Sequence, residues 1–179
     1  MRSKRYIIST LALAVALSML PNRAVTQTSI KTAPAMISVT RADELEAQAA
    51  ALHDQLKRYP EAARLYKEAA SLRSATDPRA VESLALAAHL YNYANRLFDA
   101  RRTMEQAANR ALARGDVLRA SQANLEAALF AFKQGNDSET ERMARKALKL
   151  AQSPLLTEQQ RASIINRLRA NSSVAALAN

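Results

Sequence analysis

The sequence predicts an all-α protein in which a pair of helices is repeated. Glycine and proline are scarce, with two and five in 179 residues, while Ala, Leu, Arg, Gln and Glu are abundant, which favours helices over strands and turns. No stretch shows sustained alternation of β-branched residues at a period of two, so no strand is expected. Three segments share a small residue, an apolar residue four positions later and another Ala three positions after that: 61–69, 99–107 and 139–147.

Residues 1–24 have the form of a secretory signal peptide. A basic start with Arg2, Lys4 and Arg5 precedes an uncharged apolar run of fifteen residues, which ends at Pro21. Such a run is short for a membrane span, which takes about 20 residues. We therefore expect export to the periplasm or out of the cell, with an uncleaved leader that anchors the protein to a membrane as the alternative.

The rest of the chain is expected to comprise a linker, a repeat domain and a tail. Residues 25–39 are polar, rich in Thr and without helical periodicity, which is typical of a linker. Thr40 or Asp43 is placed to cap the first helix of a domain that spans residues 40–170. Residues 171–179 are small and weakly apolar, and are expected to be a flexible tail.

Helix boundaries recur along the repeat domain. Pro60 ends the first helix, because Pro lacks an N–H and disfavours helix in the residue before it. Later boundaries carry N-cap residues, Gly after a helix end, or a capping box: Asp77-Pro78, Gly115-Asp116, Gly135-Asn136, and Thr157 with Gln160. The expected helices are 42–58, 61–74, 78–97, 99–114, 116–134, 137–152 and 157–170. Their short connections require neighbouring helices to pack antiparallel.

Small residues stand at matching positions in each helix pair, where they let the two backbones approach closely. On the first helices these are Ala49-Ala50, Ala87-Ala88 and Ala127-Ala128, and on the second helices Ala62, Ala100 and Thr140, then Ala69, Ala107 and Ala147. One pair cannot bury its apolar stripe alone, but stacking the next pair covers it. The pattern therefore predicts an array of stacked helix pairs.

This spacing resembles the tetratricopeptide repeat. The second repeat fits that family's pattern best, with Leu84, Ala87, Ala88 and Tyr91 on its first helix and Ala100, Met104 and Ala107 on its second. Gly135 falls where the family often has a turn glycine, and Lys57 and Asn95 take that place in the other repeats. The resemblance covers about residues 42–154. The chain departs from the pattern in its period, which exceeds the family's roughly 34 residues, and in the polar Glu46 and Asn124 at a bulky position.

The resemblance implies a right-handed helical-repeat solenoid of about three antiparallel helix pairs, with residues 157–170 as a C-terminal capping helix; a compact helical bundle is the alternative. It also implies that the first helices line a concave groove for an extended peptide or a partner's helix. The register places eight residues on that groove: Asp54, Gln55, His89, Asn92, Tyr93, Gln122, Phe132 and Lys133. Each is alternatively a solvated helix position or a packing residue between repeats.

No enzymatic activity, metal or cofactor is expected. The chain has no Cys, and its two histidines, His53 and His89, fall on different helices. No metalloprotease, serine-hydrolase or phosphate-loop motif occurs. His53 falls on a position that the family fills with a packed aromatic residue, so it is expected to be core or half-buried.

The formal net charge of +10 falls to +6 without residues 1–24. Acidic residues are interleaved with the basic ones throughout, which favours a solvated surface of mixed charge, with attraction to anionic lipid, acidic polymers or nucleic acid as the alternative. Arg142, Arg145, Lys146 and Lys149 line one side of a helix whose first turn is acidic, as the helix dipole favours. Nucleic-acid binding is not expected.

Two functional hypotheses follow from these features. The first is an exported, non-enzymatic scaffold that binds a protein or peptide partner in the cell envelope. The second is a basic envelope-associated protein that binds anionic lipid or cell-wall polymer through the four cations. Three repeats are near the lower limit for independent stability, so a homodimer through an open end is a further expectation.

Overall fold

The computed structural model describes residues 33–170, apart from the side chains of residues 33–35, 55 and 56. The predicted leader, residues 25–32 of the predicted linker, and the predicted tail lie outside the described residues. Residues 33–170 form seven α-helices and contain no strand, which confirms the all-α prediction. In this part of the chain, no helix combines the length and the apolar character that a membrane span requires.

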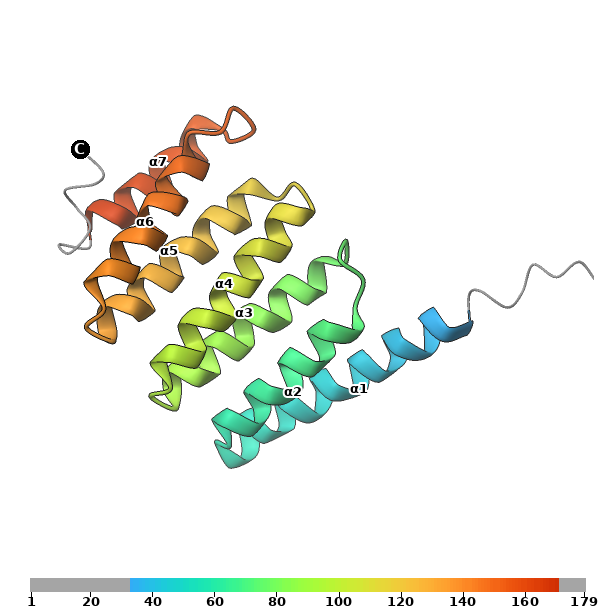
Figure 1. The fold of residues 1–179 in the computed structure, drawn as a ribbon. Coiled ribbons are helices and arrows are strands. Elements are labelled where there is room, and N and C mark those ends of the chain that lie inside the picture. Colours follow the sequence, from blue (N-terminus) through green and yellow to red (C-terminus); the bar gives the residue numbers. More distant parts are fainter. Residues whose placement is uncertain (1–32, 171–179) are drawn as a thin grey trace, which may run out of the picture. The chain divides into compact units, whose positions relative to one another are not determined.

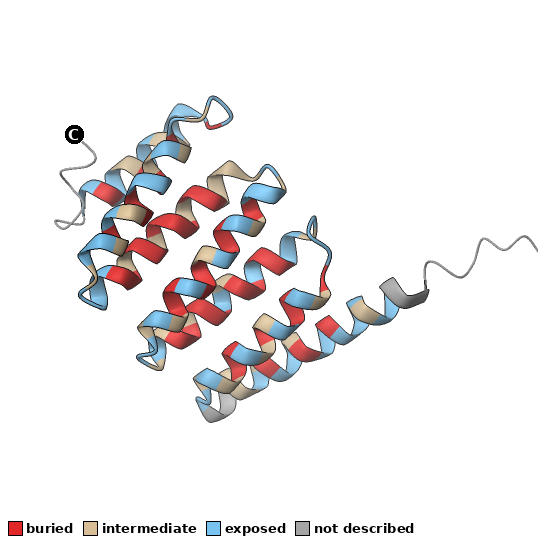
Figure 2. Cartoon of the chain, in the orientation of Figure 1, coloured by how far each residue is buried: buried red, intermediate tan, exposed pale blue. Residues whose placement is uncertain are grey.

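The helices lie side by side in sequence order (Figure 1). Their bounds are α1 (Ala33–Leu56), α2 (Tyr59–Leu72), α3 (Pro78–Tyr93), α4 (Leu97–Ala113), α5 (Val117–Lys133), α6 (Asp137–Ala151) and α7 (Glu158–Arg169). Each helix packs against the next one, and α5 also packs against α7. Buried residues are most frequent along α3, α4 and α5 and sparse along α1 and α7 (Figure 2). The first and last helices are therefore the least covered.

Alanine dominates the buried core of the described residues. The predicted small positions on the second helices of the pairs are all buried: Ala62, Ala100, Thr140, Ala69, Ala107 and Ala147. Because Ala has no side chain beyond Cβ, neighbouring backbones can approach closely, and the remaining volume is filled by a few larger residues such as Tyr66, Met104 and Met143. The small residues predicted on the first helices are buried too, except Ala50, which is half-buried, so the predicted pattern is confirmed at all but one position.

The predicted turn positions share one backbone conformation. Lys57, Asn95 and Gly135 have φ values of 51°, 57° and 73°, all in the left-handed region. After α5, the N–H of Gly135 donates to the carbonyl of Phe132 (2.9 Å), and the N–H of Asn136 donates to that of Ala131 (3.0 Å). These bonds form the Schellman motif, which satisfies the last carbonyls of a helix. Equivalent turns thus recur at spacings of 38 and 40 residues.

Most predicted helix bounds lie within two residues of the observed ones, but α3 ends at Tyr93 rather than at 97. The left-handed conformation of Asn95 stops the helix, and the N–H of Arg96 turns back to the carbonyl of Tyr91 (2.8 Å). Leu97 consequently begins α4 instead of ending α3.

The first helix also differs from the prediction, because α1 begins at Ala33 and includes residues 33–39. Thr40 does not cap this helix: its hydroxyl donates to the carbonyl of Met36 (3.0 Å), a bond made inside a helix. Pro34 is the second residue of α1, where its missing N–H costs no hydrogen bond.

Asp43, the alternative cap, lies inside α1 as well, but the N-caps predicted for the later helices are confirmed. Asp77 accepts a hydrogen bond from the N–H of Arg79 (2.8 Å), and Asp116 accepts one from the N–H of Arg119 (3.0 Å). Thr157 and Gln160 bond each other's backbone N–H in a capping box. These caps satisfy donors at the starts of α3, α5 and α7 that have no partner within the helix.

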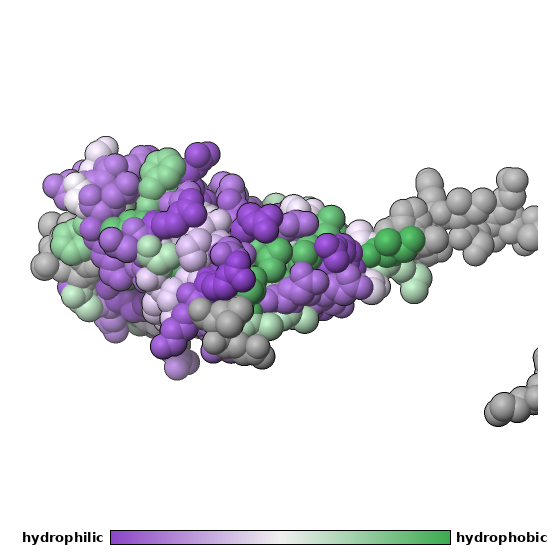
Figure 3. Space-filling model, turned by 90° about the horizontal axis from the view of Figure 1, so that it is seen from below, coloured by the Kyte–Doolittle hydropathy of each residue, from purple (hydrophilic) through white to green (hydrophobic). Residues whose placement is uncertain are grey.

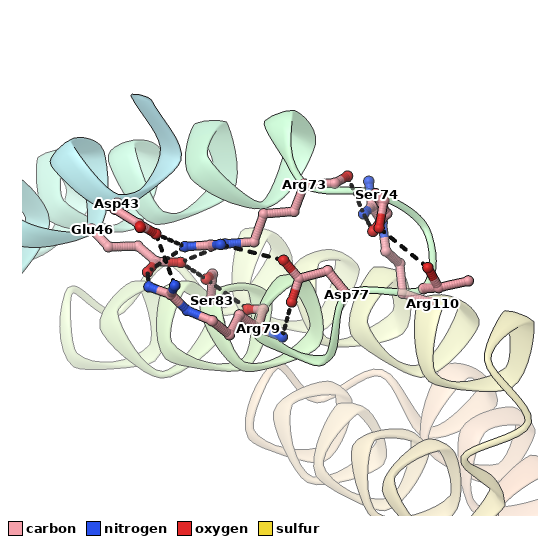
Figure 4. Close-up of polar contacts among 9 residues, drawn as sticks. Asp43, Glu46, Arg73, Ser74, Asp77, Arg79, Ser83 and Arg110 are labelled. Carbon is pink, nitrogen blue, oxygen red and sulfur yellow. Dashed lines mark hydrogen bonds and ion pairs between the residues drawn. The ribbon is translucent and has the colours of Figure 1, made fainter. Parts of the chain in front are cut away.

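A buried arginine at the end of α2 joins the first three helices (Figure 4). The side chain of Arg73 is 1% exposed; its Nη2 donates to Asp43 (2.6 Å) and to Glu46 (2.8 Å) on α1. Its Nη1 donates to Asp77 (3.3 Å), the N-cap of α3. Burial would lower the pKa of Arg73, but the hydrogen bonds from its guanidinium to Glu46 and Asp43 outweigh burial, so that pKa lies above its ordinary value.

Glu46 collects further donors from α3, which explains a polar residue at a position that the repeat pattern reserves for a bulky one. Besides Arg73, it accepts hydrogen bonds from Arg79 (2.7 Å) and from the Ser83 hydroxyl (2.5 Å). Burial would raise the pKa of Glu46, yet the hydrogen bonds from Arg73 and Ser83 hold it below its ordinary value. The carboxylate is therefore charged and fixed between α1 and α3.

Three polar contacts between alternate helices share one sequence separation. Glu82 binds Arg119 (2.9 Å) and His89 binds Glu126 (3.1 Å), each pair joining α3 to α5. On the second helices, Glu105 of α4 binds Arg142 of α6 (3.2 Å). All three pairs are separated by 37 residues in the sequence, so each helix meets its counterpart in the next pair at a similar offset.

Substitutions at two of the left-handed turns should change the free energy of unfolding in opposite directions. Gly135→Ala should lower the free energy of unfolding by about 1 kcal/mol, because an L-residue is disfavoured at positive φ. The added Cβ would meet no heavy atom within 4 Å, so the effect comes from the backbone alone. Lys57→Gly should raise the free energy of unfolding by about 0.5 kcal/mol, because Gly adopts positive φ without the penalty of an L-residue. Urea unfolding followed by circular dichroism measures both, and a loss of stability in the Lys57 variant would contradict this account.

Removing the buried guanidinium should destabilise the helix array. Arg73→Met should lower the free energy of unfolding by about 3 kcal/mol, because it leaves Asp43 and Glu46 without their buried partner. Arg79→Met is the matched control: this side chain is 47% exposed and binds the same two carboxylates, so its loss should cost less than about 1 kcal/mol. Thermal and urea unfolding compare the two variants. Equal losses would show that burial of Arg73 is not what matters.

Candidate functional site

The candidate site is a pair of adjoining pockets along α3. Within residues 33–170, no group of three or more His, Asp or Glu side chains is arranged to hold a metal ion. The larger pocket has a volume of about 440 Å³ and receives side chains from α1, α2 and α3. Its lining residues are His53, Tyr59, Tyr66, Leu86, His89, Leu90 and Tyr93. Its size and mainly apolar lining suit a binding site for side chains of a partner.

Aromatic rings line one wall of this pocket in series. The ring of His53 lies 5.9 Å from that of Tyr59, and Tyr59 lies 5.8 Å from Tyr93, both measured between centroids at tilted angles. Tyr93 is 67% exposed and Leu86 is 48% exposed, so the pocket presents apolar surface to solvent. The series thus connects the end of α1, the start of α2 and the end of α3.

Tyr66 forms the floor of the pocket. It is buried, and that burial raises the pKa of its hydroxyl; the negative charges of Glu46 and Asp54 raise it further. The phenol is therefore neutral at physiological pH, with two carboxylates close enough to affect its pKa.

A second pocket of about 190 Å³ lies between α3 and α5 and shares His89 with the first. Its other polar lining residues are Glu82, Arg119, Gln122 and Glu126. The Nε2 of His89 lies 3.1 Å from a carboxylate oxygen of Glu126, and its ring meets Phe130 edge-on at 5.9 Å. The two pockets therefore meet at one imidazole that is held from two sides. We call them together the α3 groove.

Glu126 links this groove to the last helix. Its second oxygen accepts a hydrogen bond from Arg167 of α7 (3.4 Å). Burial would raise the pKa of Glu126, but the hydrogen bond and charge of His89, aided by Arg167, outweigh burial and hold that pKa below its ordinary value. The carboxylate is ionised at neutral pH and fixes His89 at the junction.

The α3 groove contains some of the eight predicted groove residues. His89 and Tyr93 line the larger pocket, and Gln122 lines the smaller one. Asn92 lies beside them and accepts a hydrogen bond from Lys133 (3.2 Å), which bridges the ends of α3 and α5.

The remaining predicted residues lie elsewhere. Asp54 is exposed and binds the Nδ1 of His53 (3.0 Å), and Phe132 is 44% exposed; neither lines the α3 groove. Lys133 also borders a separate pocket beside the turn between α3 and α4. The side chain of Gln55 lies outside the described residues.

Most lining residues of the groove were not predicted as site residues, among them His53, Tyr59, Leu86 and Glu126. His53 was expected to be core or half-buried; it is half-buried, but it also lines the pocket. Leu86 had a usable signal, since it lies three and seven residues before His89 and Tyr93, on the same face of a helix. Tyr59 had none, because it reaches the groove only through the packing of α2 against α3.

The predicted basic face is largely neutralised. Arg142 binds Glu139 (2.7 Å), Arg145 binds Glu141 (2.5 Å), and Lys146 binds Glu105 (3.1 Å). The hydrogen bond to Glu139 holds the pKa of Arg142 above its ordinary value. Three of the four predicted cations are therefore paired with carboxylates of the same protein.

The surface drawn in Figure 3 is mainly hydrophilic, and its hydrophobic residues occur in small separate groups. Exposed apolar surface on that face is thus divided by polar side chains. A partner that docks there would meet limited apolar area in any one place.

No protein-family model matches the chain, and no match to it is found among curated proteins. The resemblance to the tetratricopeptide repeat therefore rests on the residues and spacings described above.

The position of Glu126 predicts a pH-dependent contribution to stability. Glu126→Gln should lower the free energy of unfolding by about 1 kcal/mol at neutral pH, because charge-assisted bonds to His89 and Arg167 are weakened. The folded-state pKa of Glu126 is lowered, so its stabilisation is complete above the ordinary Glu pKa of about 4.3 and is lost as pH falls through the lower folded value. The difference in the free energy of unfolding between wild type and Glu126→Gln should therefore become smaller at acidic pH.

The matched control for this prediction is Glu141→Gln. Among the described residues, that exposed carboxylate is paired with Arg145, one turn along its own helix, so its loss should cost less than about 0.5 kcal/mol. Urea unfolding from neutral to acidic pH measures both variants. A gap between wild type and the Glu126 variant that stays constant down to about pH 3 would contradict the assigned charge linkage.

Proposed function

We propose that residues 33–170 form a right-handed solenoid of three antiparallel helix pairs capped by α7, of the tetratricopeptide type. Two observations support this proposal. Left-handed turn residues recur at Lys57, Asn95 and Gly135, and polar contacts between alternate helices recur at a separation of 37 residues. Similar offsets between successive units are typical of a repeat array, since each unit contacts its neighbours in a similar way.

We further propose that the protein is an exported, non-enzymatic scaffold, which holds an extended segment of a protein partner in the α3 groove. The observation that carries this proposal is the junction at His89, where two pockets meet along one helix. A series of pockets suits alternate side chains of an extended peptide. Export to the cell envelope is proposed from the basic and apolar residues 1–24 alone.

The second hypothesis, binding of anionic lipid or cell-wall polymer, has less support. Cations that bind a polymer must exchange their internal partners for external ones, and Arg142, Arg145 and Lys146 already have carboxylates within 2.5–3.2 Å. The gain from a new anionic contact is reduced by the loss of the existing one.

Selection of short random peptides on the immobilised full chain, followed by fluorescence polarisation of the enriched peptides, tests the groove. Leu86→Ser with Tyr93→Ser should weaken binding at least about tenfold, which corresponds to about 1.4 kcal/mol. Leu112→Ser is the matched control, because this exposed Leu lies on α4 and lines neither pocket of the groove. Binding should change little between about 0.15 M and 0.5 M salt, since apolar contacts are not screened.

Two results would overturn the proposal. Equal affinity of wild type and the double variant would exclude the groove as the binding surface. Enrichment of no peptide, together with sedimentation on phosphatidylserine vesicles that disappears at moderate salt and in Arg145→Gln with Lys149→Gln, would favour the second hypothesis.

A further inference from the structure

The larger pocket of the α3 groove has the composition of a site for a cation. Three tyrosine rings and two imidazoles line it, and no Lys or Arg is among the described residues that line it. The faces of aromatic rings carry negative electrostatic potential, which attracts a cation placed within about 6 Å of a ring centroid. The tilted rings of Tyr59 and Tyr93, 5.8 Å apart, both border the opening, where Tyr93 is largely exposed.

Each imidazole of the pocket is paired with a carboxylate. Asp54 lies 3.0 Å from the Nδ1 of His53, and Glu126 lies 3.1 Å from the Nε2 of His89. Glu46 and Asp54 bring further negative charge close to the pocket, since both add to burial in raising the pKa of the Tyr66 hydroxyl. An incoming cation would therefore be attracted both by the rings and by the carboxylates near them.

The positive charges around this pocket are paired with carboxylates. His89, whose charge helps to lower the pKa of Glu126, lies 3.1 Å from that carboxylate. Arg58, which precedes Tyr59, pairs with Glu61. Arg79, which borders the adjoining surface with Glu46, binds both Asp43 (2.9 Å) and Glu46 (2.7 Å). Arg167 is held by Glu126 (3.4 Å). Each of these positive charges is thus offset by an adjacent carboxylate.

We propose that this pocket binds an arginine side chain of the segment held in the α3 groove, an inference that rests on the proposed function. The guanidinium lies over the rings of Tyr59 and Tyr93, and the methylene groups lie against Leu86. Arginine fits better than lysine, because the guanidinium is planar, stacks on rings and is weakly hydrated. The protein makes the same contact within its own chain, where Arg96 lies 5.1 Å from the centroid of Tyr91.

Peptide pools with one fixed central residue test this inference on the full chain. The pools carry Arg, Lys, citrulline or Leu at the centre, flanked by random uncharged residues, and compete with a fluorescent Arg-centred peptide. The Arg pool should bind at least about fivefold more tightly than the citrulline pool, which has nearly the same shape without the charge. Lys should fall between them. Ring resonances of ¹³C-labelled tyrosine should shift most with the Arg pool.

Tyr93→Leu should bring the ratio of Arg to citrulline affinities close to one while the Leu pool still binds, because the variant keeps an apolar wall and loses the ring. Phe132→Leu is the matched control: this exposed aromatic lies outside the pocket, so the ratio should not change. Circular dichroism verifies the fold of both variants.

Each other outcome has one meaning. Equal binding of the Arg and citrulline pools overturns the arginine site but keeps the peptide groove. A preference for Arg that persists in Tyr93→Leu also overturns the site, because the charge is then recognised elsewhere. Failure of every pool to bind overturns the proposed function together with this inference.

Discussion

The helix array depends on one buried charge at the end of α2. Arg73 is at the point where α2 ends, and its guanidinium contacts α1 and the N-cap of α3 at once. The carbonyl of the same residue accepts a hydrogen bond from Arg110 of α4 (3.3 Å), so four helices meet there. A buried guanidinium keeps its charge, so these carboxylates must stay in place around it. The position of α1, and with it one wall of the groove, follows from this constraint.

An alanine-rich core brings helices close but defines their offset weakly, because small side chains interlock little. The polar contacts between alternate helices provide what the core lacks. A shift of one residue would separate Glu82 from Arg119 and Glu105 from Arg142, whereas most buried Ala contacts would find new neighbours. Apolar burial thus drives the association of the helices, and charge pairs fix their register.

Local features could be predicted from the sequence, and contacts between distant residues could not. The caps at Asp77 and Asp116 act within three residues, and the small positions such as Ala62 and Ala100 repeat, so both are visible in the sequence. The buried position of Arg73 could not be predicted, because its partners on α1 lie 27 and 30 residues away in the sequence. The groove was predicted only where it lies on α3 and α5. Tyr59 joins it through tertiary packing, which no single-helix pattern describes.

His89 lines both pockets of the groove, so binding in one pocket affects binding in the other. Any occupant that displaces the imidazole in one pocket also moves a wall of the other and strains the bond to Glu126. By thermodynamic reciprocity, filling the second pocket must alter the affinity of the first by the same factor. The affinity of a segment that spans both pockets therefore depends on both pockets together. Two shorter ligands, one in each pocket, would not bind independently.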